Sequence, residues 1–420
     1  MSARRLPTDS VLSIAAYRRL LVSRFISNLG NGMAPIALAF GVLALPGTDA
    51  TSLSIVLAAQ AIPVVLVLPI GGVIADRFGR ARVIFMSDTV LGLVVMTIAV
   101  LFLTGTATVL WLAVLGAVTG CLNALWWPAY TGMVPDTVED RHLRPANAYL
   151  SVASNSGLIL GSALGGLLVA LVGPGLAVAF DATTFLVSAG LVFTIRHLSR
   201  PNVSGDSMFG DLAHGWRVFL SYRWVVVIVA AYSVILMASQ GAEEVLGPVI
   251  AVQEYGGPAG WAVVLSAQSA GLLAGAVAAT RIRSKRPMVL GMLLTLTIPV
   301  QLMFLGLALP LGWITAGAFA LGFSMEVFMV IWFTAMQSNI PRDALSRVSS
   351  YDAMGSLMLG PVGLALAGPL AAAVGLQTAF LLAATVALVA IAVSLLAPSI
   401  WRLRGDEQGT ADPGAPHATT

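Results

Sequence analysis

The chain alternates between long apolar runs and short polar segments. A helix needs about 20 apolar residues to cross the hydrocarbon core of a bilayer, and each run reaches that length. The runs are continuously apolar, whereas the strands of an outer-membrane barrel are short and alternate in polarity. The pattern therefore predicts an all-α polytopic membrane protein with 12 transmembrane helices. The expected spans are residues 18–45, 51–74, 83–104, 108–133, 146–172, 176–197, 223–252, 259–281, 287–309, 312–338, 351–373 and 377–398.

The basic residues follow the same alternation. All 22 Lys and Arg residues lie in or next to every second polar segment and can be placed on one side of a membrane, and the turns on the other side contain none. Cytoplasmic loops of inner-membrane proteins are enriched in Lys and Arg, so we expect a multi-pass protein of the bacterial inner (plasma) membrane with both termini in the cytoplasm. The basic segments are 4–24, 77–82, 141–144, 196–223, 281–286, 342–347 and 402–404.

Composition agrees with a membrane protein. Hydrophobic residues make up 58% of the chain and charged residues 10%, with a mean hydropathy of +0.91. The net charge of +3 fits loops beside anionic lipid and gives no reason to expect nucleic-acid binding. The single Cys121 excludes a disulfide within one chain, and we expect a monomer. The N-terminus has no small-residue cleavage site, so a removable signal peptide is not expected.

The chain is organised as two halves. Six expected spans precede a polar break at residues 198–222, and six follow it. A charged loop and then a Gly-rich span follow Pro135, and the same order recurs after Pro341. This repetition favours an internal duplication, as in many secondary transporters, over the alternative that Gly-rich helices simply pack closely. The expected divisions are a cytoplasmic N-terminus (1–17), a first six-helix bundle (18–197), a linker (198–222), a second bundle (223–398) and a disordered cytoplasmic tail (399–420).

The break carries an apolar pattern of its own. Phe209, Leu212, Trp216 and Phe219 recur at spacings of three, four and three. These residues share one helical face, which predicts a short amphipathic helix on the cytoplasmic membrane surface. An ordinary solvated connector is the alternative.

The segment between the second and third spans reads GVIADRFGRAR from Gly72 to Arg82. A tight turn at Gly79 would join two helix ends, and the charged side chains can hold one arrangement of the helices and release it in another. This string resembles the G-x-L-A-D-R-x-G-R-K signature of the major facilitator superfamily, with Ile74 and Ala81 in place of the Leu and the Lys. The candidate conformational latch comprises Gly72, Asp76, Arg77, Gly79, Arg80 and Arg82.

Two further strings narrow the resemblance. The fifth span is similar to a signature of proton-coupled antiporters, with Ser162 in place of its Pro and helix-packing glycines at Gly157, Gly161, Gly165 and Gly166. Segments from Pro128 to Pro135 and from Asp181 to Ala189 resemble the subgroup of macrolide, multidrug and enterobactin exporters. The resemblance implies two pseudo-symmetric six-helix bundles (the major facilitator fold), whose first, fourth, seventh and tenth spans line a central cavity.

Few ionisable residues remain at membrane depth, and each is a functional candidate because charge is costly there. Glu326 lies near the centre of the tenth span, and Glu243 and Glu244 lie in the seventh. Desolvation favours the protonated form of a carboxyl, which lets a buried acid bind and release a proton. We expect Glu326 to couple protons and one of the other two acids to meet a cationic substrate; an acid satisfied by a neighbouring side chain is the alternative.

Polar side chains also form two stripes on spans expected to line the cavity. Arg24, Asn28 and Asn31 share one face of the first span, although Arg24 could instead extend to the cytoplasmic surface. Asn123, Trp127 and Tyr130 share a face of the fourth span.

Two further acids, Asp88 and Asp181, lie in spans that are peripheral in the superfamily, so we interpret both as structural.

Together these features predict proton-coupled efflux of amphipathic drugs, antibiotics or secondary metabolites by alternating access. Siderophore export, import of a small solute, and a non-transport signalling or lipid-moving role are alternatives. No phosphate-binding loop, H-E-x-x-H or G-x-S-x-G sequence occurs, so we expect no enzyme activity, no catalytic residues, no metal and no cofactor, with the proton gradient as energy source. The expected partners are a small amphipathic molecule, protons and the lipid bilayer.

Overall fold

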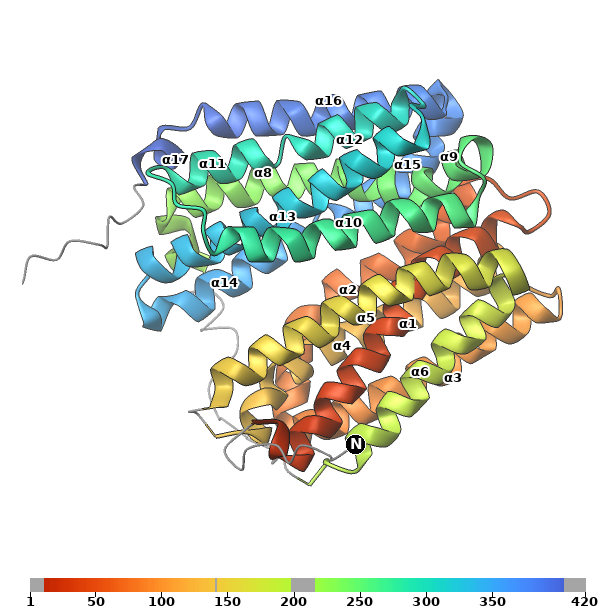
Figure 1. Ribbon diagram of the computed structural model, residues 1–420, viewed down its shortest axis with the longest axis horizontal. Helices are drawn as coiled ribbons and strands as arrows, with labels where there is room; N and C mark the ends of the chain where they lie inside the picture. Colours follow the sequence, from red (N-terminus) through yellow and green to blue (C-terminus); the bar gives the residue numbers. More distant parts are fainter. Residues whose placement is uncertain (1–10, 140–141, 198–215, 404–420) are drawn as a thin grey trace, which may run out of the picture.

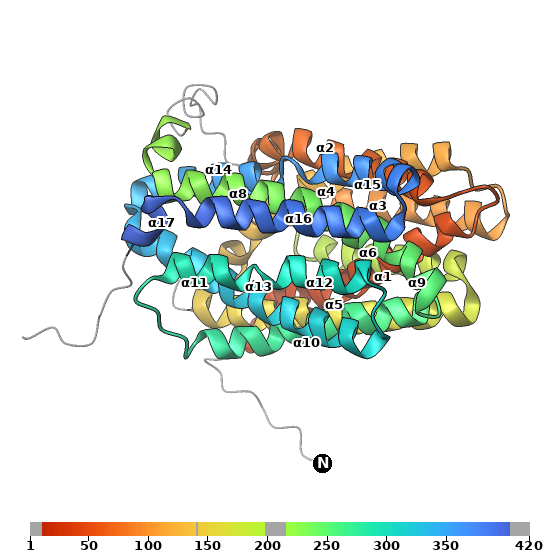
Figure 2. The same ribbon diagram turned by 90° about the horizontal axis from the view of Figure 1, so that it is seen from above.

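The computed structural model describes residues 11–139, 142–197 and 216–403. Within these ranges every regular element is helical. Twelve helices are long and apolar enough to span a membrane, which confirms the predicted fold class. A helix satisfies its own backbone N–H and C=O groups, so it can lie in lipid without water. Figure 1 shows these helices gathered into two bundles, and Figure 2 shows that they run along one common direction.

The first bundle contains one helix per span. Its helices are α1 (Ala15–Leu43), α2 (Ala50–Phe78), α3 (Arg80–Leu103), α4 (Val109–Thr137), α5 (Leu143–Val172) and α6 (Pro174–Phe193). A short 3-10 turn at Val11–Ser13 precedes α1.

The second bundle has interrupted spans. Its seventh span consists of α8 (Arg223–Gln240), the π-helical segment η3 (Gly241–Leu246) and α9 (Gly247–Glu254). The remaining elements are α10 (Pro258–Ala279), α11 (Pro287–Leu294), α12 (Thr297–Gly306), α13 (Leu311–Asn339), α14 (Arg342–Leu357), α15 (Gly360–Val374), α16 (Leu376–Leu395) and α17 (Pro398–Arg402).

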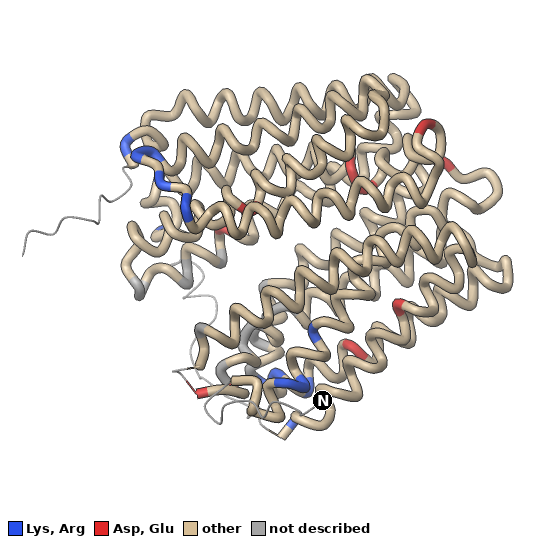
Figure 3. Tube along the Cα trace, viewed as in Figure 1, with Lys and Arg blue, Asp and Glu red and all other residues tan. Residues whose placement is uncertain are grey.

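The described Lys and Arg residues gather at one end of both bundles, as Figure 3 shows, and we call this the basic end. The turns at the opposite end, the far end, rely on glycine. Gly47, Gly105, Gly173, Gly256 and Gly375 all have positive φ, which other residues adopt only with strain. Gly173 and Gly375 hold corresponding places, before α6 and before α16, which agrees with a duplicated architecture.

The helix α2 begins at the far end with a capping box. The carboxylate of Asp49 accepts a hydrogen bond from the backbone N–H of Ser52 at 2.9 Å, and the Ser52 hydroxyl lies 3.4 Å from the Asp49 N–H. The backbone hydrogen bond from Ser52 holds the pKa of Asp49 below its ordinary value. Such a cap fixes where the helix enters the membrane.

The two bundles touch through small residues at the far end. The backbone N–H of Gly368 in α15 donates a hydrogen bond of 2.8 Å to Oγ of Ser54 in α2. On the other side, a Cβ added at Gly166 of α5 would overlap Ala262 of α10. In Figure 1 the bundles diverge from these contacts toward the basic end, so this conformation is closed at the far end.

Two segments differ from the sequence-based expectation or extend beyond the described residues. The segment after Pro341, expected as a charged loop up to Arg347, is the start of helix α14, because Pro341 occupies the position just before its first turn. The predicted amphipathic helix over Phe209 to Phe219 lies mostly outside the described residues. Residues 216–221 are helical, and the rings of Trp216 and Phe219 pack on Tyr351 at centroid distances of 5.4 and 5.9 Å.

The far-end contact gives a first prediction. A Cβ at Gly368 would meet the backbone of Ala50 and Thr51, so Gly368→Val should force α15 away from α2. Ser54 is only 1% exposed, and we expect Ser54→Cys, in a Cys121→Ala background, to resist a membrane-impermeant maleimide. Adding Gly368→Val should make this cysteine reactive in the purified protein.

Gly190→Val is the matched control. Gly190 also lies within a helix, but a Cβ there meets no atom within 4 Å. Gly190→Val should leave the cysteine protected. Equal labelling of the Gly368→Val and Gly190→Val proteins would contradict the proposed contact.

Candidate functional site

A cavity of about 320 Å³ lies inside the first bundle, between α1, α2, α3, α4 and α6. Glu244 of η3 and Leu364 of α15 complete its wall from the second bundle. The volume lies at the lower end of the range of small-molecule sites, and the lining is largely apolar, as in most such sites. Its polar lining residues are Asn31, Gln60, Thr119, Asn123, Asp181 and Glu244.

Local sequence explains why these helices leave polar groups in the cavity. Pro35 lies inside α1 and lines the cavity, and its ring nitrogen cannot donate to the carbonyl of Asn31 one turn earlier. Gly120 lets α4 approach the backbone of α2 at Gln60, because any Cβ there would overlap the Gln60 carbonyl. Thr119 bonds within its own helix, donating to the Gly116 carbonyl at 2.7 Å.

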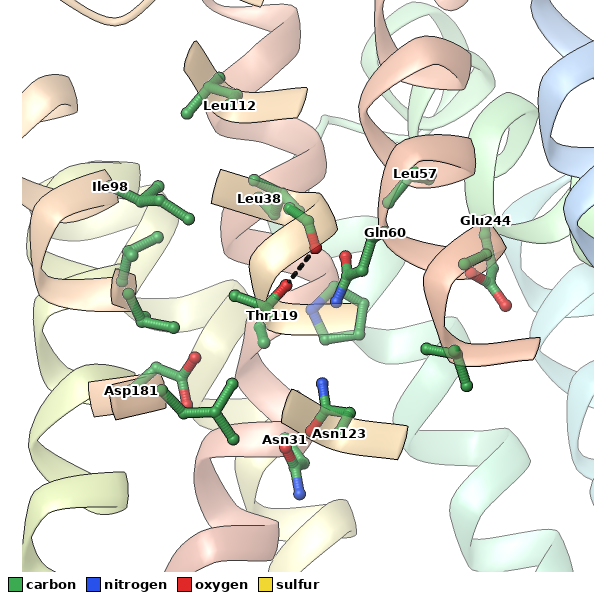
Figure 4. A pocket seen from close by; sticks show the side chains of 18 of the residues that line it. Asn31, Leu38, Leu57, Gln60, Ile98, Leu112, Thr119, Asn123, Asp181 and Glu244 are labelled. Atoms are coloured by element: carbon green, nitrogen blue, oxygen red, sulfur yellow. Dashed lines mark hydrogen bonds between the residues drawn. The ribbon is translucent and has the colours of Figure 1, made fainter. Parts of the chain in front are cut away.

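The two acids of the cavity lie on opposite sides of it. Figure 4 shows Asp181 on one side and Glu244 on the other, with Asn31, Gln60, Thr119 and Asn123 between them. A ligand that fills the cavity would therefore meet carboxyl groups at two separated points and amide groups along its length.

Asp181 is buried without a complete set of partners. Its side chain is 2% exposed, and its Oδ1 accepts no hydrogen bond. Gly30 of α1 provides the space for this carboxyl and for the Thr184 hydroxyl, because a Cβ at that position would overlap both. An uncompensated ionised carboxylate is costly in an apolar interior, so a proton or a cationic ligand would stabilise it.

The structure separates the two adjacent acids of the seventh span. They lie in the π-helical segment η3, a distortion frequent at functional sites. Glu244 lines the cavity. Glu243 is half-buried and is not among the residues that line it.

Glu326 lies away from this cavity. It is half-buried on α13, and Gly275 of α10 lies against it, since a Cβ at Gly275 would be 3.0 Å from the Cβ of Glu326. The structure therefore does not bring Glu326 together with the cavity acids.

Arg24 and its neighbours form a second polar group. Nε of Arg24 donates a 2.9 Å hydrogen bond to Oγ of Ser154. The guanidinium carbon lies 4.8 and 4.6 Å from the ring centroids of Trp126 and Tyr130, so Arg24 turns toward α4 and α5. The side chain of Trp127 lies outside the described part of the chain.

Asn28 and Asn31 connect this group with the cavity. Nδ2 of Asn31 donates a weak hydrogen bond of 3.4 Å to Oδ1 of Asn28. Asn28 is 3% exposed, and its own Nδ2 has no partner. The polar stripe expected on α1 thus runs from Arg24 to the cavity.

The latch segment begins α3 with a tight turn. Gly79 has φ +89° between α2 and α3. Arg80 forms a 3.5 Å ion pair with Asp136 at the end of α4, whereas Arg77 and Arg82 are exposed. The side chain of Asp76 lies outside the described part of the chain, and Gly72 has no side chain.

The glycines of α5 divide between two neighbours. Gly157, Gly161 and Gly165 face α1, where Cβ atoms would overlap or crowd Phe25, Leu29 and Met33 respectively. Gly166 instead faces α10 at the contact between the bundles. Close helix packing is therefore the role that the geometry gives these glycines.

Sequence reasoning did not assign three of the six polar cavity residues to the site, namely Gln60, Thr119 and Asp181. The available signal for Asp181 was its charge at membrane depth, which we set aside because the resemblance placed its span at the periphery. Gln60 also lies deep in an apolar run, where few other side chains form strong hydrogen bonds.

Comparison with known proteins agrees with this architecture. The family model described as "Major Facilitator Superfamily" matches residues 20–360. The multidrug efflux pump Tap of Mycolicibacterium fortuitum is 29% identical over 382 residues, covering 86% of this chain and 90% of the relative. The enterobactin exporter EntS of Salmonella choleraesuis (strain SC-B67) is 25% identical over 371 residues, covering 85% and 88%.

Solved structures show the same fold at low identity. The nucleoside transporter NupG superposes with a TM-score of 0.71 at 11% identity, covering 92% of this chain and 99% of that protein. A POT family transporter in complex with 5-aminolevulinic acid gives a TM-score of 0.73 at 13% identity, covering 91% and 96%. At this identity the likeness concerns the fold alone.

The packing beside Asp181 gives a second prediction. Gly30→Ala should lower the unfolding temperature in detergent, because its Cβ displaces Asp181 and Thr184, and overpacking costs about 1–3 kcal/mol. Gly190→Ala should raise it or leave it unchanged, since the same substitution meets open space there. Equal unfolding temperatures for the two variants would show that the carboxyl of Asp181 is not confined by α1.

Proposed function

Since the chain belongs to the major facilitator superfamily and has the helices of a multi-pass membrane transporter, we propose that it exports amphipathic compounds in exchange for protons. The supporting observation is the cavity, with its largely apolar wall and its two acids on opposite sides. An apolar wall takes the hydrophobic body of a ligand, and a carboxylate binds an amine or other cationic group. The proposed cargo is therefore an amphipathic cation, such as a basic drug, antibiotic or secondary metabolite.

The shape of the molecule supports loading from the cytoplasm. The positive-inside rule assigns the basic end to the cytoplasm, and both described termini, Val11 and Leu403, belong to that end. The bundles meet at the far end and diverge at the basic end. In this arrangement we propose that the transporter takes up cargo from the inside and that rocking of the bundles then releases it outside.

The named relatives favour export over import. Tap is described as a multidrug efflux pump and EntS as an enterobactin exporter. The acidic cavity favours cationic cargo for this chain, whereas an anionic siderophore would meet like charge there. Siderophore export is retained as the second candidate because of the match to EntS.

Protons are the proposed energy source, and the proposed assembly is a monomer. The chain contains no sequence for binding nucleotide phosphates. Acids at membrane depth in and beside the cavity supply groups that can exchange protons, namely Asp88, Asp181, Glu243 and Glu244.

A transport assay tests this function directly. Cells expressing the chain should accumulate less of a lipophilic cation such as ethidium than control cells, and a protonophore should abolish the difference. Proteoliposomes that hold the purified protein should move the dye when a pH gradient is imposed. Unchanged accumulation over a broad panel of cationic and neutral amphiphiles would contradict the proposal.

The acid at the bundle interface gives a more specific prediction. Glu244→Gln should weaken export of ethidium, because the cation loses a carboxylate, while export of an uncharged dye such as Nile red should change less. Glu254→Gln is the matched control, since Glu254 is an exposed acid at the end of the same span. Equal loss for both dyes would indicate that Glu244 does not select for charge.

A further inference from the structure

An acid and a base lie close together inside the first bundle without forming an ion pair. Asp88 of α3 is fully buried, and Arg24 of α1 is partly buried. The two groups are close enough to interact electrostatically, yet they do not form an ion pair. Both lie about 12–14 Å along their helices from the basic end, at a depth where unpaired charge is costly.

Asp88 already has one firm hydrogen bond. Ser188 of α6 donates to its Oδ2 at 2.6 Å, and the hydroxyls of Ser188 and Ser23 lie 2.8 Å apart. The indole of Trp126 also interacts with this carboxyl, but its Nε1 makes no hydrogen bond of good geometry. Oδ1 of Asp88 therefore has no hydrogen-bond partner.

Arg24 is held away from Asp88 by other contacts. The rings of Trp126 and Tyr130 are stacked with centroids 4.7 Å apart, and the guanidinium lies over both. Ser154 accepts a hydrogen bond from its Nε. The hydroxyl of Tyr130 is buried without a partner. The cation thus rests on neutral groups, which suits a state in which Asp88 carries no charge.

The same helix faces lead from these residues to the cavity. Arg24 precedes Asn31, Tyr130 follows Asn123, and Ser188 follows Asp181, each by seven residues. Seven residues are about two helical turns, or about 10 Å, so each pair lies on one face. Asn28, with its unpartnered Nδ2, lies between Arg24 and Asn31. Polar groups therefore continue from the cavity past Asp88 toward the basic end.

From this arrangement we propose that Asp88 carries the transported proton and that Arg24 competes with the proton for the Asp88 carboxylate. The inference rests on proton-coupled export as the proposed function. In the conformation described here, the proton is bound to Asp88 and the guanidinium lies on Trp126, Tyr130 and Ser154. When the O–H bond breaks, the proton passes to water at the basic end and Arg24 pairs with the carboxylate. Rebinding of a proton at Asp88 frees Arg24 again.

Few other titratable groups face Asp88. From α1 the groups are Arg24 and, through Tyr130, Tyr17, whose hydroxyl donates to the Ala146 carbonyl at 2.6 Å. From α4 the group is Tyr130. From α6 the facing side chain is Ser188, with Asp181 two turns away, and α2 has no ionisable residue between Ala50 and Ile74. A pH response of this region would therefore depend mainly on Asp88 and Arg24.

Spectroscopy on the full chain tests the proposal without any knowledge of the cargo. Spin labels at Asn147→Cys and Thr280→Cys, in a Cys121→Ala background, report the separation of α5 and α10 at the basic end. Both positions are exposed, and the same two helices meet at the far end through Gly166. The distance between the labels should change as the pH passes from mildly acidic to mildly alkaline.

Variants identify the responsible group. Asp88→Asn keeps the shape and hydrogen-bonding oxygen of the side chain but cannot release a proton, so the pH response should disappear. Arg24→Gln should move the midpoint of the pH response to higher pH, because the proton no longer competes with the guanidinium. Arg24→Lys should bring this midpoint part of the way back to the parent value. Glu326→Gln, the acid favoured from sequence, should respond like the parent protein.

A transport assay distinguishes a loss of proton coupling from a loss of folding. In proteoliposomes, Asp88→Asn should lose ethidium movement driven by a pH gradient but retain exchange of labelled for unlabelled dye at equal pH. A pH response that persists in Asp88→Asn, or that is lost in Glu326→Gln instead, would overturn the assignment. If the parent protein moves no dye but its label distance still responds to pH through Asp88, the proposed function fails while the proton site stands.

Discussion

The absence of water from the bilayer core constrains this structure more than any other factor. Backbone groups must bond within their own helix, and each polar side chain must find a partner inside the protein. The first bundle gathers many of its intramembrane polar residues on the inward faces of α1, α4 and α6, and a few of their buried atoms remain without a partner. Helix packing provides the faces: Gly30 makes room for Asp181, and Gly157 and Gly161 bring α5 against α1. The polar groups are placed by small residues, so the site depends on close packing.

The two bundles contribute unequally to the site, although their helices correspond. The first bundle supplies most of the cavity wall and the buried pair of Arg24 and Asp88. The corresponding region of the second bundle is aromatic: Tyr232 stacks on Phe328 at 5.4 Å, and Nε1 of Trp332 donates to Asp352 at 3.0 Å. Its contribution to the cavity is Glu244 from the π-helical segment, together with the apolar Leu364 of α15. In the mechanism that we propose, the first bundle would bind the proton and both bundles would contact the cargo.

The sequence predicted the spans well because apolar length and basic loops are properties of the chain itself. It predicted the cavity only in part, because the direction of a side chain depends on which helix packs against it. Asn31, Asn123 and Glu244 line the cavity. Glu326 faces α10 instead, and Asp181 was set aside because its helix was expected to be peripheral. The contact of α6 with α1 through Gly30, which turns Asp181 inward, cannot be read from periodicity. Breaks such as η3 also shift the faces of a helix.

The position of the charges suggests why the bundles can alternate. At the far end they meet through a backbone hydrogen bond to Ser54 and through glycine contacts. Such contacts require no desolvation of charge, so closing and opening that end need involve no large electrostatic change. The costly groups lie elsewhere, in the buried acids and in Arg24, where protonation or cargo alters the balance of charge. A ligand shifts a conformational equilibrium only through its different affinity for the two states. A carboxyl that is neutral in one state and paired with Arg24 in the other would supply that difference for a proton.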